Sequence, residues 1–208
     1  MFGNVTSPVT YTLLFANAAI FLWSYYGHRD YTNQFAEWPY QIVRRKKYYQ
    51  IITSGFLHAG WMHLFFNLFT LYSFGTFLES FFVKIEGPVF GSIYFFVIYF
   101  VSLLCGSLLT VATHYKDPGY VAVGASGAIS GIIFSFIIFF PFSQISLFFI
   151  PMPAFLFAIL YIVASVYGMK QQFGNIGHEA HLGGALGGVI ATLILIDSAM
   201  RILIGHFS

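Results

Sequence analysis

Long stretches without a charged residue alternate with short polar connections along this chain. No Asp, Glu, Lys or Arg occurs in residues 1–28, 48–78, 87–115, 118–169 or 180–196. A helix needs about 20 mainly apolar residues to cross the hydrocarbon core of a bilayer. The five stretches have room for six such helices, because the longest stretch holds two. The pattern therefore predicts an all-α, polytopic membrane protein.

The predicted spans are bounded by polar residues, glycines and prolines. We expect them at about Val9–Tyr26, His58–Phe82, Pro88–Thr113, Gly124–Pro141, Ala154–Met169 and Gly177–Ile196. No Lys or Arg precedes the first span and no small-residue cleavage site ends it, so we do not expect a removed signal peptide. The spans leave almost nothing for a soluble domain, and we expect residues 1–208 to form a single membrane domain.

Composition narrows the class of protein further. Only 8% of the 208 residues are charged, whereas soluble globular proteins have roughly 25%. This excludes an ordinary soluble enzyme and a disordered chain. The 9 Lys and Arg against 7 Asp and Glu give a net charge of +2, so no basic surface exists for nucleic acid. The single Cys105 excludes a disulfide framework and a Cys-x-x-Cys metal site.

The first connection, residues 27–50, is the only long one and contains the basic run Arg44–Lys47. Trp38, Tyr48 and Tyr49 lie close to this run, and aromatic residues mixed with cations are typical of a membrane interface. We expect the run to contact lipid headgroups. By the positive-inside rule the first connection is cytoplasmic, since its side of the membrane holds seven Lys and Arg and the other side only Lys84 and Arg201. The seven are Arg29, Arg44, Arg45, Lys46, Lys47, Lys116 and Lys170.

A first cluster of polar residues lies in the second span, where polar groups are costly and usually face the protein interior. His63, Asn67 and Thr70 are spaced to share one face of a helix. Histidine and asparagine side chains both donate hydrogen bonds. Two donors on one face in a low-dielectric site are what a developing oxyanion needs. On these residues alone, hydrogen bonding to a neighbouring helix is the simpler explanation.

A second cluster opens the fourth span. Gly124, Gly127, Ala128 and Gly131 form a stripe of small residues, which lets two helix backbones approach closely. Ser126 lies in the first helical turn, where free backbone N–H groups favour negative charge. A nucleophile there would have an oxyanion-stabilising amide beside it. On these residues alone, a plain packing helix with Ser126 as its cap is the simpler explanation.

A third cluster opens the sixth span. One helix face carries His181, Gly184, Ala185 and Gly188. The imidazole of His181 is therefore the only large side chain among these four residues. The glycine-rich fourth span is the natural packing partner of this stripe. Packing therefore predicts that His181 lies next to Ser126.

Two other chemistries compete with a Ser-His pair. A zinc peptidase motif has two histidines at i and i+4, whereas His178 and His181 are at i and i+3, and His58 and His63 are at i and i+5. A metal held by histidines from three spans remains an alternative. Glu179 points to the other side of its helix from His181, so a full Ser-His-acid triad is not expected. A Ser126–His181 dyad is the simpler arrangement.

The three clusters, in this order, resemble the rhomboid family of intramembrane serine proteases. The family signature is His-x4-His-x3-Asn in the second span, Gly-x-Ser-Gly in the fourth, and Ala-His followed by small residues in the sixth. The corresponding residues here are His58, His63 and Asn67, then Gly124-Ala-Ser126-Gly127, then Ala180-His181-Leu-Gly-Gly. The resemblance covers about residues 50–195.

The resemblance implies roles for these residues. Ser126 would be the nucleophile and His181 its general base. His63, Asn67 and the Ser126 amide would form the oxyanion hole, and His58 would be a structural or water-retaining residue. Glycines of the fourth span, Gly127 and Gly131, would carry the close helix contact.

Two positions depart from the family's pattern. Tyr49-Gln50 stands where many rhomboids have Trp-Arg before the second span, so the resemblance does not imply how the first loop is anchored. Ser130 stands where some members have an aromatic residue that stacks on the histidine. Another residue must therefore hold His181.

The family also implies an orientation that the charge count contradicts. Six-span rhomboids usually have cytoplasmic termini and an external first loop, and we follow the resemblance, since Arg44–Lys47 can lie flat on the membrane surface. We expect the bacterial cell membrane as the location.

The expected activity is cleavage of transmembrane segments of other membrane proteins within the bilayer, without a metal or other cofactor. The alternative is a non-catalytic rhomboid-like protein that binds or stabilises membrane proteins, although such relatives typically lack the serine or the histidine. A transporter would predict an inverted internal repeat, which the sequence does not show.

Overall fold

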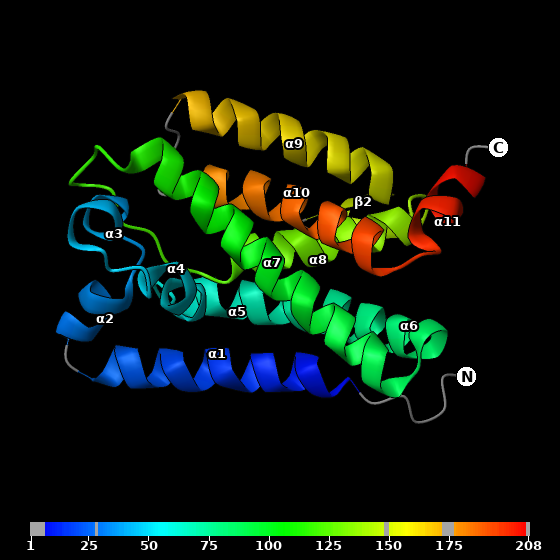
Figure 1. Cartoon of the computed structure of the whole chain (residues 1–208), viewed down its shortest axis with the longest axis horizontal. Helices are drawn as coiled ribbons and strands as arrows, with labels where there is room; N and C mark the ends of the chain where they lie inside the picture. Colours follow the sequence, from blue (N-terminus) through cyan, green and yellow to red (C-terminus); the bar gives the residue numbers. More distant parts are fainter. Residues whose placement is uncertain (1–6, 28, 148–149, 172–176, 207–208) are drawn as a thin grey trace.

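The computed structural model describes residues 7–27, 29–147, 150–171 and 177–206, most of which are helical (Figure 1). The helices are α1 (Pro8–Tyr26), α2 (Arg29–Phe35), α3 (Pro39–Arg45), α4 (Gln50–Thr53), α5 (Trp61–Thr70), α6 (Thr76–Glu86), α7 (Pro88–His114), α8 (Ser126–Phe139), α9 (Ala154–Gln171), α10 (His178–Leu195) and α11 (Ala199–Gly205). A 3₁₀ turn, Ser54–Phe56, follows α4, and a π-helical turn, Leu71–Gly75, joins α5 to α6. The predicted helical class is confirmed.

Four helical segments of the described residues are long and apolar enough to cross a membrane. They are Trp61–Glu86, which combines α5 and α6, and the helices α7, α9 and α10. The 14 residues of α8 give it a length of only about 21 Å at 1.5 Å per residue. The 19-residue α1 does not meet the same criterion. The chain therefore has a multi-pass helical membrane fold, and the predicted spans at α1 and α8 stay predictions.

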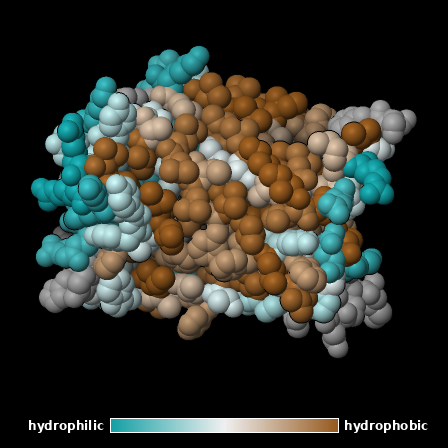
Figure 2. Space-filling view, in the orientation of Figure 1, coloured by the Kyte–Doolittle hydropathy of each residue, from teal (hydrophilic) through white to brown (hydrophobic). Residues whose placement is uncertain are grey.

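The outer surface is apolar over the middle of the molecule and polar at both ends. Figure 2 shows a broad hydrophobic belt between two hydrophilic ends. Large apolar side chains point outward from several helices, among them Phe15, Phe69, Val163 and Ile194. An apolar surface of this extent marks contact with lipid. The start of α1 and helix α11 lie at one end of the molecule, and α2, α3 and α4 lie at the other (Figure 1).

The first connection folds into α2, α3 and α4, and side chains around α4 anchor it. Gln50 is fully buried, and its Nε2 donates to the Gln34 carbonyl oxygen at 2.9 Å. The Tyr49 hydroxyl donates to the same oxygen at 3.2 Å. Thr53 Oγ1 donates to the Phe35 carbonyl oxygen at 2.8 Å. Tyr49 and Gln50 thus anchor the loop at the positions where the family pattern has Trp-Arg.

A buried carboxyl group joins α1, α6 and α7. Glu79 of α6 is fully buried, and its Oε2 accepts hydrogen bonds from the amide and the hydroxyl of Thr10, both at 2.8 Å. Its Oε1 accepts from the Val9 amide at 3.0 Å and from the Ser92 hydroxyl at 2.8 Å. These donors include backbone N–H groups of the first turn of α1, which have no partner within the helix. Glu79 therefore fastens the start of α1 to the bundle.

A short antiparallel hairpin follows α8 and was not predicted. Its strands, β1 (Gln144–Leu147) and β2 (Ile150–Pro153), pair Gln144 with Pro153 and Ile145 with Met152. The prolines of β2 cannot donate to a sheet, which suits a two-stranded ribbon with two edges.

Helix α8 lies at the centre of the bundle, and α10 contacts it through glycines. Every residue of α8 after Ser126 is buried. A Cβ atom on Gly184 would lie 2.0 Å from the Gly127 carbonyl oxygen, and one on Gly188 would lie 2.4 Å from the Gly131 Cα. Both distances are far below van der Waals contact, so the two backbones touch directly. The predicted packing of the two small-residue stripes is therefore what the structure shows.

Gly184→Ala should lower the stability of the protein by about 1–3 kcal/mol, the usual cost of forcing an extra group into a packed core. The added methyl group has no space, because its nearest neighbour is backbone rather than a flexible side chain. Thermal unfolding in detergent micelles measures the effect. Gly205→Ala is the matched control, since nothing lies within 4 Å of the corresponding position in α11. Equal unfolding temperatures for both variants would contradict the close contact.

Candidate active site

Ser126 is the first residue of α8 and follows a turn that requires glycine. Gly124 has φ +134°, a backbone conformation that is essentially restricted to glycine. Its amide donates to the Ser54 carbonyl oxygen at 3.0 Å, which fixes the turn against the 3₁₀ segment. The half-buried Ser126 side chain is therefore presented at the N-terminus of α8, where backbone N–H groups are free to bind an anion.

His181 lies in the first turn of α10 and reaches Ser126. The distance between His181 Nε2 and Ser126 Oγ is 2.9 Å. The glycine contact between α8 and α10 makes this approach possible, because larger side chains would separate the two helices. A hydroxyl hydrogen-bonded to an imidazole is the arrangement of a nucleophile with its general base.

His63 and Asn67 approach the turn before Ser126 from α5. A Cβ atom on Gly124 would lie 2.8 Å from His63 Nε2 and 3.8 Å from Asn67 Nδ2, so both nitrogens face this turn. Asn67 Nδ2 is buried without a hydrogen-bond partner among the described residues. A buried donor without a partner is costly, and a negatively charged oxygen at this position would satisfy it. The structure thus brings together the residues predicted for an oxyanion hole.

His58 lies behind His63 rather than beside Ser126. It is buried in the loop before α5, with its ring edge-on to His63 at 5.1 Å and to Phe21 of α1 at 6.3 Å between centroids. This placement supports the His63 ring from the side of α1. Its predicted structural role stays a prediction.

Tyr161 of α9 is a residue of this site that the sequence did not identify. Its ring centroid lies 5.8 Å from that of His181, and its hydroxyl is hydrogen-bonded to Ser130 Oγ. Nothing in the local sequence distinguishes it from the other 13 tyrosines. The one available signal was indirect: Ser130 lacks an aromatic ring, so a ring to hold His181 had to come from another helix.

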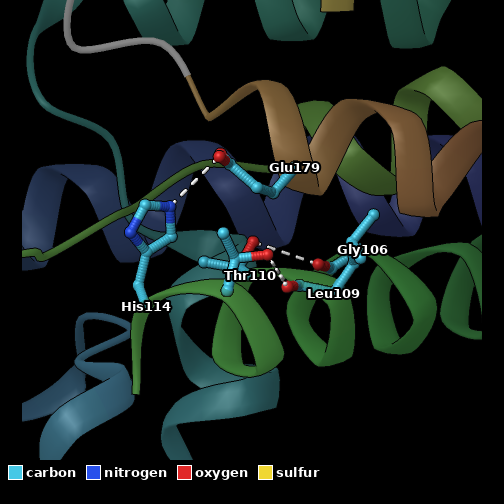
Figure 3. Close-up of polar contacts among 6 residues, drawn as sticks. Gly106, Leu109, Thr110, His114 and Glu179 are labelled. Carbon is cyan, nitrogen blue, oxygen red and sulfur yellow. Dashed lines mark hydrogen bonds and ion pairs between the residues drawn. The ribbon is translucent and has the colours of Figure 1, made fainter. Parts of the chain in front are cut away.

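Glu179 turns away from His181 and joins α10 to α7. Figure 3 shows its carboxyl group facing His114, with 3.1 Å between Glu179 Oε1 and His114 Nε2. The His114 ring stacks on Tyr120 at 3.7 Å. The pair therefore ties the first turn of α10 to the last turn of α7. Among the described residues, no group of three or more His, Cys, Asp or Glu side chains is arranged to hold a metal ion.

Comparisons with known proteins identify the family of the chain. The rhomboid domain model matches residues 45–198. The chain is 32% identical over 193 residues to "Rhomboid protein 1, mitochondrial" of Saccharomyces cerevisiae, covering 88% of this chain and 51% of that protein. It is 31% identical over 199 residues to "RHOMBOID-like protein 12, mitochondrial" of Arabidopsis thaliana, covering 91% and 59%. It is 29% identical over 154 residues to "Rhomboid protease GluP" of Bacillus subtilis, covering 74% and 27%. The chain belongs to the rhomboid family.

The relatives differ from this chain in length and inform its location. The chain spans only 51% and 59% of the length of the yeast and plant relatives. Both of these relatives are named mitochondrial, so the expected bacterial cell membrane is not supported. What the comparisons do support is an integral, multi-pass membrane protein.

Glu37, outside the predicted spans, ties the first connection to the segment that leads to Ser126. Its amide and carbonyl pair with those of Ala122, at 2.9 Å in both directions. Its side chain is buried, and this burial raises the pKa of Glu37 from 4.5 to about 8, although a hydrogen bond with the Ser107 side chain lowers it in part. Burial and the nearby carboxyl groups of Glu179 and Glu37 also raise the pKa of Tyr120.

The stability contributed by Glu37 should fall as pH rises. Its folded-state pKa lies above 4.5, so the folded protein binds this proton more tightly than the unfolded chain does. The stabilisation is complete below about pH 4.5 and is lost progressively up to about pH 8. Glu37→Gln should flatten the decline in unfolding temperature between pH 5 and pH 8. Asp30→Asn, at an exposed carboxyl group, should leave it unchanged, and parallel curves for the wild type and Glu37→Gln would contradict the assignment.

Proposed function

We propose that this chain is an intramembrane serine endopeptidase that cleaves transmembrane segments of other membrane proteins. The observation that carries the proposal is the 2.9 Å distance between Ser126 Oγ and His181 Nε2. Family membership and the donors of α5 beside the same turn add support. No cofactor is part of the proposal.

The arrangement suggests the following steps. With the ring proton on Nδ1, His181 Nε2 accepts the Ser126 hydroxyl proton while Oγ attacks the carbonyl carbon of a peptide bond. The oxygen that becomes negatively charged is stabilised by His63, Asn67 and the Ser126 amide. The imidazolium of His181 then gives its proton to the departing amine, which leaves an ester on Ser126. Water activated by His181 hydrolyses that ester and restores the hydroxyl.

The fold supports a site below the membrane surface. A helix of about 21 Å cannot reach both faces of a hydrocarbon core about 30 Å thick, and the proposal places the Ser126 end of α8 within that core. The polar side chains around Ser126 would retain water there. Substrates should be helices with destabilising small residues, because the peptide bonds of an intact helix are shielded.

A non-catalytic rhomboid-like protein that binds membrane proteins is the competing function. Such a protein does not need a nucleophile within hydrogen-bond distance of an imidazole, and this chain has one. A fluorophosphonate probe separates the two functions. Attachment at Ser126 that is lost in Ser126→Ala supports the protease, and absence of attachment in folded protein supports the binder.

The positions of the two ends of the chain bear on its orientation in the membrane. The first residues of α1 and helix α11 lie at the same end of the molecule (Figure 1), which agrees with termini on one side. We propose that this side is the cytoplasm and that the exposed residues Arg44–Lys46 contact headgroups on the opposite side.

Ser126→Ala and His181→Ala should each abolish cleavage of a model transmembrane substrate without unfolding the protein. Because the two residues act as one unit, the double variant should be little worse than either single variant. Initial rates of purified protein in detergent provide the measurement. Ordinary activity in His181→Ala would rule out the dyad. A chelator should have no effect, and inhibition that zinc reverses would revive the metal alternative.

Asn67→Ala should lower kcat by about 10–10³-fold, the scale for losing one oxyanion donor. KM should change little, because the Asn67 amide meets its partner only when the oxygen becomes charged. Thr70→Ala, one turn further along α5, is the matched control and should retain activity. A large rise in KM with unchanged kcat would instead make Asn67 a binding residue.

A further inference from the structure

The His181 ring lies between two groups from different helices. Its Nε2 is 2.9 Å from Ser126 Oγ of α8. The ring of Tyr161, from α9, lies 5.8 Å away at an inclination of 37°. His178, in the same helix turn, meets it edge-on at 6.5 Å. Tyr161 is thus the aromatic neighbour of His181 that belongs to neither helix of the dyad.

Tyr161 is fixed at its tip by Ser130. The Ser130 hydroxyl donates its single proton to the Ser126 carbonyl oxygen at 2.7 Å. Its oxygen is then the acceptor for the Tyr161 hydroxyl, to which it is hydrogen-bonded. Ser130 is buried, so water does not compete for this bond. One serine therefore connects the Tyr161 ring to the backbone of the candidate nucleophile.

Two further rings lie against Tyr161, both in tilted arrangements. Phe157, one turn earlier in α9, lies 5.5 Å away, and Phe134 of α8 also lies 5.5 Å away. Contacts of this kind leave a side chain few alternative rotamers. The ring is therefore a rigid surface beside His181.

His181 needs such a surface because its neighbouring carboxyl group is engaged elsewhere. Glu179 faces His114 of α7 at 3.1 Å. In a triad the acid orients the imidazole, whereas a dyad must orient it by packing. A ring that rotates freely about its Cβ–Cγ bond would present Nε2 to Ser126 only part of the time.

From these contacts we infer that Tyr161 is the positioning residue for His181 in the proposed dyad, with Ser130 as its anchor. The inference rests on the proposed function. It also couples the dyad to the placement of α9, a helix with few buried residues: Ala154, Phe157, Ser165 and Gly168.

Variants of Tyr161 separate positioning from general stability. Tyr161→Leu removes the ring and should lower kcat by about 10–100-fold, the scale for misplacing a catalytic group, with KM within about twofold. Tyr161→Phe keeps the ring but loses the bond to Ser130, so kcat should fall by only about fivefold, the scale of one lost hydrogen bond. Tyr167→Leu is the matched control, because Tyr167 lies on the same helix and is 61% exposed. It should behave as the wild type.

Three results would overturn the inference. The first is a kcat of Tyr161→Leu that equals that of the wild type. The second is a fall in kcat that is equally large in Tyr161→Phe and Tyr161→Leu. The third is a fall in kcat that is fully explained by a smaller fraction of folded protein. If Tyr161→Leu does not fold in micelles, Ser130→Ala decides, since it leaves the ring without its anchor. A fall in kcat of about fivefold is then expected, and unchanged kcat rejects the role.

Failure of the proposed function can be told apart from failure of this inference. Wild-type protein that neither cleaves substrate nor reacts with a fluorophosphonate refutes the protease. The Tyr161 contact is then measured by NMR of histidine side chains, where Tyr161→Leu should shift the His181 ring signals and Tyr167→Leu should not. His181 signals that stay in place in Tyr161→Leu would show that the tyrosine does not hold the ring.

Discussion

The direct backbone contact between α8 and α10 is the constraint on which the rest of the site depends. Lipid tails are as apolar as the side chains of a helix, so helices in a membrane associate by close packing rather than by the hydrophobic effect. Here a Cβ atom on Gly184 would lie 2.0 Å from the Gly127 carbonyl oxygen. The missing side chains of these glycines bring the two helices together, and Ser126 and His181 stand at the ends of the same two stripes. The distance between Ser126 and His181 is therefore set by packing.

Buried polar groups add to the helix packing, because each one joins segments that are far apart in sequence. Glu79 accepts hydrogen bonds from α1 and α7, Glu179 joins α10 to α7 through His114, and the backbone of Glu37 joins the first connection to the segment before Ser126. In a low-dielectric interior, a polar group that loses its partner is costly. These contacts therefore favour one arrangement of the helices over its alternatives.

The sequence predicted the parts of this structure that depend on spacing within one helix. The glycine stripes and the shared face of His63 and Asn67 follow from helical periodicity, and pairing the stripes placed His181 beside Ser126. The Tyr161 contact depends on how α9 is rotated, which no periodicity reveals in a helix that is apolar on all sides. The sequence did not predict the helices of the first connection, for another reason. Their hydrogen bonds use backbone carbonyl groups, such as that of Gln34, which leave no mark in a sequence.

The direction of the helices also matters for the proposed chemistry. Ser126 opens α8, His63 lies in the first turn of α5, and His181 lies in the first turn of α10, so the N-termini of these helices converge on one point. Each N-terminus carries a partial positive charge of about half an elementary charge. An oxyanion at Ser126 would face these fixed dipoles in a site of low dielectric, where they act more strongly than in water. This convergence would add to the stabilisation of the oxyanion that the Asn67 amide provides.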